Sequence, residues 1–230
     1  MSGDARARIL ATIRDSLGAD APGRDESAVE ARLAAHEPNL IPARARIDPG
    51  AQVDLFVEMA EEVSTTVARV AGADEVPGAV ADYLTAHNLP AVAKLAPDPG
   101  LDDIPWAERP TLTLSRGKAV DEDAVTITGA FAGIAETGTL MLLSGPDHPT
   151  TLNILPETHI VVLRREHIVG AYEEGWARLR AEGRGMPRTV GFVTGPSRSA
   201  DIEQTILIGA HGPRRLHIVL IDGDGEETEA

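Results

Sequence analysis

Short apolar segments alternate with helical segments along most of the chain, from residue 65 to residue 221. The apolar segments are rich in Val, Ile and Leu, whereas the segments between them repeat their apolar residues at helical spacing. This alternation favours an α/β fold in which a mainly parallel sheet is flanked by helices. The expected strands are 65–70, 91–95, 111–114, 125–134, 138–143, 159–163, 189–194 and 216–221, and the expected helices between them are 77–87 and 166–182.

A different pattern precedes the α/β region. Apolar residues at helical spacing predict a helix over 4–18, and a second helix is expected near 26–35, before a linker rich in proline. Residues 1–48 are therefore predicted to form an N-terminal helical extension. The main domain is expected to cover residues 49–222 and to begin with an amphipathic helix, and residues 223–230 are expected to be a solvated acidic tail.

Composition narrows the classes of function. The 230 residues include no cysteine, so this sequence cannot supply a thiolate nucleophile or the thiolate ligands of an iron–sulfur cluster. The formal net charge of -15 disfavours nucleic acid as a partner, because phosphate backbones are also negative. Since there is no apolar run of about 18 residues and no signal-peptide pattern, we expect a cytoplasmic protein without a membrane span.

One acid stands between two apolar segments, in the sequence Glu136-Thr137-Gly138-Thr139. A carboxylate beside two hydroxyls at the end of a strand is suited to act as a general base, or as a nucleophile toward an acyl group. Gly138 would let a ligand approach the backbone closely. The alternative is a turn that carries an ordinary exposed acid.

A second polar segment, 194–203, contains Gly195, Ser197, Arg198, Ser199 and Asp201. We expect a strand, a loop and then a helix that begins near Asp201 with Ser199 as its N-cap. Such a loop can bind an anion through its amides and hydroxyls, with help from Arg198. Asp201 is itself negative and would not bind an anion; it would bind a substrate hydroxyl or orient Arg198. The alternative is an ordinary capped loop between a strand and a helix.

Histidines supply further candidates. His211 lies between glycines before the last strand and could serve as an acid–base group, or could belong to a simple turn. His148 and Asn153 could reach a site at the end of the 138–143 strand. We expect His159 to be structural and His167 to help start the following helix. No histidine spacing typical of a metal site is present, so no metal is expected.

Four segments in this order resemble the LUD domain family, and within it the lactate utilization proteins. They are GIAETGT at 133–139, LPETHI at 155–160, TGPSRSADIE at 194–203 and GAHGP at 209–213. The resemblance covers roughly residues 50–222. It implies a fold similar to that of ribose-5-phosphate isomerase, glucosamine-6-phosphate deaminase and CoA transferases.

The same resemblance implies a function. The protein would be the non-redox component, with no cofactor of its own, of a system that oxidises L-lactate to pyruvate together with two partner proteins, one of them an iron–sulfur protein. From the convergence of the polar segments on strand ends, we expect Glu136 to take the hydroxyl proton of a small carboxylate substrate, with His211 nearby. The expected substrate-binding residues are Thr137, Gly138, Thr139, Gly195, Ser197, Arg198, Ser199 and Asp201. The alternatives are an assembly module for the partner proteins, or a stand-alone enzyme acting on a sugar phosphate or an acyl-CoA. A homo-oligomer is compatible with all of these.

Overall fold

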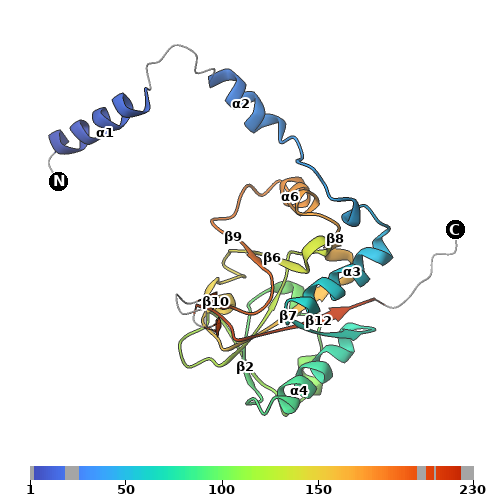
Figure 1. Ribbon diagram of the computed structural model, residues 1–230. Helices are drawn as coiled ribbons and strands as arrows, with labels where there is room; N and C mark the ends of the chain where they lie inside the picture. The colour runs from blue at the N-terminus through green and yellow to red at the C-terminus, as the bar shows by residue number, and fades with distance from the viewer. Residues whose placement is uncertain (1–2, 19–25, 201–205, 210, 224–230) are drawn as a thin grey trace. The chain divides into compact units, whose positions relative to one another are not determined.

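The computed structural model describes residues 3–18, 26–200, 206–209 and 211–223, and its chain divides into two compact units (Figure 1). The first unit is residues 1–39 and the second is residues 40–230. Within the first unit lie α1 (Gly3–Leu17) and α2 (Glu26–Ala35), where two helices were expected. Both helices expose large apolar side chains, namely Ile9, Leu10, Ile13, Leu17, Val29 and Leu33.

A six-stranded parallel sheet forms the centre of the second unit, which confirms the predicted α/β class. Its strand order is β1-β12-β7-β4-β2-β3. The middle strands are almost continuously buried, as expected of parallel strands covered on both faces. The strands are β1 (Thr66–Val70), β2 (Val92–Leu95), β3 (Thr113–Arg116), β4 (Val125–Gly129), β7 (Thr158–Arg164) and β12 (Arg215–Ile221).

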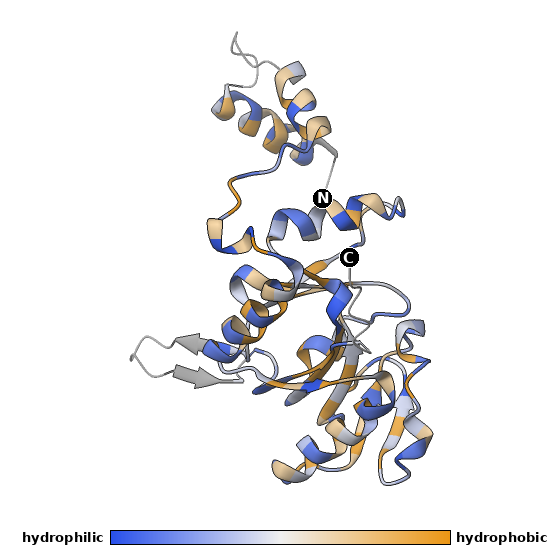
Figure 2. Cartoon of the chain, turned by 90° about the vertical axis from the view of Figure 1, so that its right-hand side faces the viewer, coloured by the Kyte–Doolittle hydropathy of each residue, from blue (hydrophilic) through white to orange (hydrophobic). Residues whose placement is uncertain are grey.

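Two amphipathic helices cover opposite faces of this sheet (Figures 1 and 2). One face packs on α4 (Val76–Ala86), which contributes the buried Val80 and Leu84. The other face packs on α3 (Pro49–Glu62), which contributes the fully buried Phe56. The side chain of Asp48 accepts a hydrogen bond from the backbone amide of Ala51 at 3.0 Å, so the predicted helix begins at a regular N-cap.

A second, four-stranded sheet with the order β8-β5-β6-β9 was not anticipated. The single strand predicted over 125–134 was wrong, because the chain leaves the large sheet after β4 and enters the small one. The helix predicted over 166–182 was too long: the β-branched residues Ile168 and Val169 pair with β5, and the helix starts only at Tyr172. The strands predicted over 138–143 and 189–194 belong to the small sheet. The elements of this region are β5 (Ala132–Ile134), β6 (Thr139–Leu143), β8 (Ile168–Val169), β9 (Val190–Val193), α5 (Thr151–Ile154) and α6 (Tyr172–Ala181).

The N-cap role expected of Ser199 is also corrected, whereas the helical turn expected near residue 201 lies outside the described residues. Residues 198–200 form β10 (Arg198–Ala200), which pairs antiparallel with β11 (Ile206–Ile208). Ser199 is opposite Leu207 in this hairpin, so it is a strand residue. The β-branched and apolar sequence Thr-Ile-Leu-Ile at 205–208 favours a strand over a helix. Asp201 lies outside the described residues.

Short segments complete the second unit. Residues 40–48, which the sequence grouped with the N-terminal extension, belong to this unit, and Ala45 within them is fully buried. Asp222, the last residue of the predicted main domain, forms an ion pair with Arg69 at 2.8 Å, and residues 224–230 lie outside the described residues.

In the part of the chain that the structure describes, no helix is long and apolar enough to cross a membrane. Short 3₁₀ helices occur at Ala43–Ala45, Ala73–Glu75, Pro99–Leu101, Trp106–Glu108, Ala135–Thr137 and Arg165–His167.

Candidate functional site

A cavity of about 320 Å³ opens at the carboxyl ends of the adjacent strands β2, β4 and β7. Open parallel sheets bind their ligands at this edge, and the volume falls at the lower end of the range for small-molecule sites, roughly 300–1,000 Å³. We call it the arginine cavity, because three arginines line it. Its polar lining residues include Asp98, Thr128, His148, Asn153, Arg164, His167, Arg178, Glu182 and Arg184.

Two of the three arginines on the wall of the arginine cavity already lie beside a carboxylate. Arg164 donates to both carboxylate oxygens of Asp103 at 2.7 Å. Nε of Arg184 lies 3.7 Å from a carboxylate oxygen of Glu182. His148 lies 3.6 Å from a carboxylate oxygen of Asp98. Arg178 is the third arginine of the cavity wall, and its contacts are of a different kind.

Arg178 projects from α6, and no carboxylate of the described residues lies within ion-pair distance of its guanidinium. The group lies over the ring of Phe131, 5.1 Å from the centroid, and donates one long hydrogen bond of 3.4 Å to the carbonyl of Glu166. Burial lowers the pKa of Arg178 below its ordinary value, although the charges of Glu182 and Glu166 oppose that effect. A partly buried guanidinium without a carboxylate partner is suited to bind an anion.

His167 shares the arginine cavity with Arg178 and is half-buried. It belongs to the 3₁₀ helix Arg165–His167 between β7 and β8, so it does not start the long helix as the sequence indicated. Burial and the neighbouring charge of Arg178 lower the pKa of His167 below its ordinary value, while Glu166 and a hydrogen bond to the Ala130 carbonyl oppose the shift. The imidazole is therefore neutral at pH 7.

A second cavity, of about 230 Å³, adjoins the first. We call it the histidine cavity, because His159 and His211 both line it. Asn153 lines both cavities. Nε2 of the fully buried His159 is 2.8 Å from the hydroxyl of Thr128, which lines the arginine cavity. A hydroxyl–imidazole pair thus stands between the two cavities.

Three residues predicted to form the site line the histidine cavity. Gly195, Ser197 and His211 meet there, although they come from separate segments of the chain. Arg198 is directed elsewhere, since its guanidinium donates to the carbonyl of Val63 at 2.9 Å and to the hydroxyl of Ser64. Because Val63 ends α3, this arginine stabilises the carbonyl end of a helix.

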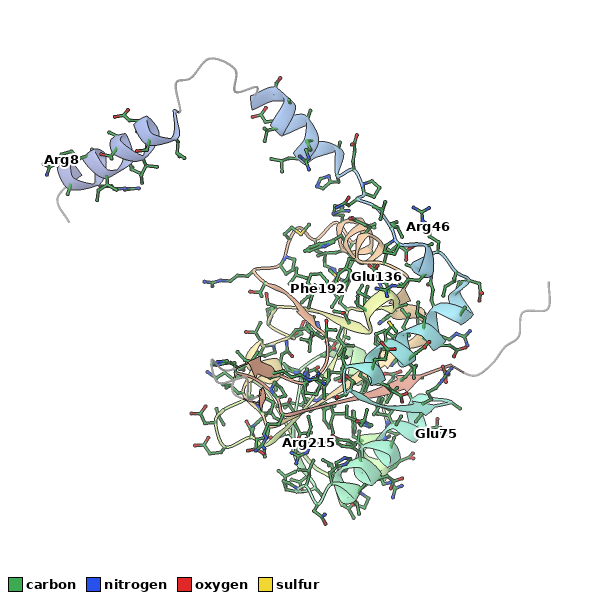
Figure 3. The ribbon with its side chains drawn as sticks, viewed as in Figure 1. Arg8, Arg46, Glu75, Glu136, Phe192 and Arg215 are labelled. Atoms are coloured by element: carbon green, nitrogen blue, oxygen red, sulfur yellow. The ribbon has the colours of Figure 1, made fainter. Side chains whose placement is uncertain are left out.

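The carboxylate of Glu136 points toward α6, beside which it lies in Figure 3. Its Oε1 accepts a hydrogen bond from the backbone amide of Tyr172, the first residue of that helix, at 3.1 Å. The side chain is only 7% exposed, and the lining of neither cavity includes it. Glu136 therefore has a structural task, the stabilisation of the positive end of α6.

Replacing Glu136 by glutamine should separate the structural task from catalysis. Glutamine keeps an oxygen acceptor and loses only the charge, so we expect the free energy of unfolding to fall by about 1 kcal/mol. Leucine removes the acceptor and leaves the Tyr172 amide unpaired, with a loss of about 2–3 kcal/mol. Urea unfolding measures both values. If Glu136→Gln abolished function while its stability stayed within this range, Glu136 would regain the role of a base.

Thr137 and Thr139 belong to a cluster of hydroxyl groups under α6. Their Oγ1 atoms are 2.7 Å apart, and both lie within 3.0 Å of the Tyr172 hydroxyl. Thr139 also bonds to the hydroxyl of Thr194 at 2.6 Å, so the first and second polar segments of the sequence do meet. Gly138 adopts a left-handed φ of 61°. The space beside it is filled by the backbone of α3, so it offers no approach for a ligand.

Known proteins share much of this sequence and architecture. Residues 53–221 match the LUD domain. The chain belongs to the LUD domain family. Among its curated relatives is a lactate utilization protein C of Deinococcus radiodurans, 36% identical over 154 residues, which are 65% of this chain and 70% of that protein. A lactate utilization protein C of Exiguobacterium sp. is 31% identical over 60% of both chains. An uncharacterized protein of Neisseria meningitidis is 40% identical over 41% of this chain.

The alignments to the first relatives are partial, because this chain matches only 40% of the Neisseria protein and 60% of the Exiguobacterium protein. A crystal structure of a DUF162 family protein from Deinococcus radiodurans resembles the LUD domain described here, with a TM-score of 0.56 and 25% identity. That likeness covers 76% of this chain and 99% of the other. It supports the α/β architecture of the family.

Two histidine-segment candidates from the sequence, His148 and Asn153, do line the arginine cavity of this LUD domain. Arg164 and Arg178 were not selected, and His167 was assigned only to the start of a helix. The available signal was a cation on the buried side of an amphipathic helix, since Arg178 lies three residues after the buried Gly175 and one before the buried Leu179. No group of three or more His, Asp or Glu side chains that could hold a metal occurs among the described residues.

Proposed function

We propose that this LUD domain protein is a non-redox subunit of a lactate-utilising system, and that it binds the carboxylate of L-lactate or pyruvate in the arginine cavity. The observation that carries the proposal is Arg178, whose guanidinium faces the cavity without a carboxylate partner among the described residues. One guanidinium without a carboxylate partner matches a ligand with one carboxylate group. The choice of lactate or pyruvate as the ligand is supported by the relatives named lactate utilization protein C.

The charge balance favours a small monocarboxylate over a polyanion. Arg164 and Arg184 already face Asp103 and Glu182, and both acids would repel additional phosphate groups. Asp98 adds a further negative charge to the wall. A sugar phosphate or an acyl-CoA, each with at least two negative charges, would therefore be less well accommodated than lactate.

Electron transfer would take place outside this chain. The sequence has no cysteine, so an iron–sulfur cluster would be held by a partner protein. We propose two such partner proteins, one of them carrying the cluster, which receive the two electrons that lactate loses when it becomes pyruvate. The chain would act in the cytoplasm, where it would present the bound carboxylate to the two partner proteins.

Replacing Arg178 by methionine should weaken L-lactate binding by about 30-fold, because a charge-assisted hydrogen bond contributes roughly 2 kcal/mol. Methionine keeps much of the side-chain volume over Phe131 and removes the charge. Isothermal titration of the full chain with L-lactate measures the change. A strain that carries only this variant should also fail to grow on lactate while it grows normally on glucose.

Arg180→Met is the matched control, because Arg180 lies on the same helix but does not line the cavity. Its lactate affinity and growth should equal those of the unaltered protein. Thermal melting of both variants checks that the fold is retained. Equal lactate binding by Arg178→Met and the unaltered chain would exclude the arginine cavity as the carboxylate site.

A further inference from the structure

The imidazole of His167 lines the arginine cavity together with Ala130, whose carbonyl favours a proton on the ring. In the neutral ring one nitrogen carries no proton and can only accept a hydrogen bond. No side chain of the described residues forms a hydrogen bond with that nitrogen, and His167 lines the arginine cavity. The cavity wall therefore carries one hydrogen-bond acceptor beside one guanidinium without a carboxylate partner.

The groups around His167 keep it in this state near neutral pH. Arg178 of α6 and Arg164 of β7 disfavour a positive charge on the ring, as does its burial. Glu166 of the same 3₁₀ helix acts in the opposite direction. Burial is the largest of these influences, so the ring stays neutral and the acceptor stays available.

We propose that His167 determines the specificity of the arginine cavity for 2-hydroxy carboxylates. This inference rests on the proposed binding of the carboxylate to Arg178. A hydroxyl on the carbon next to that carboxylate can donate its proton to the free nitrogen of His167. A 2-oxo group has no proton to donate, and an unsubstituted carbon has no polar group at all. The cavity should thus bind the reduced acid in preference to the oxidised one.

The test is titration of the full chain at pH 7.5 with L-lactate, pyruvate and propionate. We expect L-lactate to bind about tenfold more tightly than either of the other acids, because one additional hydrogen bond contributes roughly 1 kcal/mol. The comparison uses the unaltered protein, so it does not depend on whether a variant folds. Equal affinities for L-lactate and propionate would overturn the role of His167.

Replacing His167 by phenylalanine should remove the preference. L-lactate binding should weaken about tenfold, to the level of propionate, while propionate binding stays nearly constant. His36→Gln, on an exposed residue of the first unit, is the control and should keep the preference. A tenfold preference that persisted in His167→Phe would overturn the inference but leave the Arg178 site intact. Failure of all three acids to bind the unaltered chain would overturn the proposed function and this inference together.

Discussion

Replacing Gly138 by alanine is expected to lower the free energy of unfolding by about 4 kcal/mol or more, among the largest effects of a single substitution. A Cβ at this position would lie 2.2 Å from the backbone nitrogen of Ala60 and 2.5 Å from the backbone carbon of Met59. These atoms belong to α3 and cannot move without displacing the helix from the core. The left-handed φ of 61° adds strain for any residue with a side chain.

Gly183→Ala separates the two contributions to this effect. Gly183 has a similar φ of 67°, but a Cβ at residue 183 would meet no atom within 4 Å. Its substitution should therefore show the backbone strain alone, about 1 kcal/mol. Urea unfolding of both variants gives the comparison. If the two variants lost similar stability, the close packing of α3 on residue 138 would be wrong.

Acid should destabilise the fold well above the pH at which most carboxylates titrate. Burial lowers the pKa of His159 to about 3 and that of His217 to about 4, whereas both rings titrate at the ordinary value of 6.5 in the unfolded chain. Well above pH 6.5 neither state binds these protons, so the two rings cause no pH dependence. Below pH 6.5 the unfolded chain gains protons that the folded protein cannot accept, and stability falls until the folded pKa is reached.

The expected loss between pH 6.5 and pH 5 is about 1.5 kcal/mol for each ring and about 3 kcal/mol for the pair. Urea unfolding at a series of pH values measures it. In His159→Gln, which can still bond to Thr128, the slope of stability against pH should fall by about 1 kcal/mol per pH unit over this interval. An unchanged slope would show that His159 is already protonated in the folded state at pH 5.

The strands and the family were accessible from sequence, because each depends on residues close together in the chain. The run of buried residues in β7 and the apolar face of α3 follow from local periodicity. The segments that carried the LUD resemblance are also local. Recognition of the family succeeded even though its chief residue, Glu136, proved to stabilise a helix end.

The second sheet and the arginine cavity could not be predicted in the same way. Whether residues 125–134 form one strand or two depends on where the chain leaves the first sheet, which neighbouring strands decide. Arg178 lies without an ion pair while Glu182 faces Arg184 instead, and Arg164 on the same cavity wall pairs with Asp103, which is distant in sequence. The hydroxyl cluster around Thr139 likewise brings together three separate parts of the chain.

The sequence by itself determined the α/β class, the absence of thiolate chemistry and the family, since composition and short-range pattern suffice for each. Tertiary structure alone decided which polar residues face a cavity and which support the fold. Glu136 and Arg198 form hydrogen bonds with the ends of α6 and α3, whereas Arg178 and His167 line the arginine cavity. A charged side chain is available to a ligand only where the folded chain provides it with no partner. Which groups become partners depends on the tertiary structure, because the residues that meet in the fold are often distant in sequence.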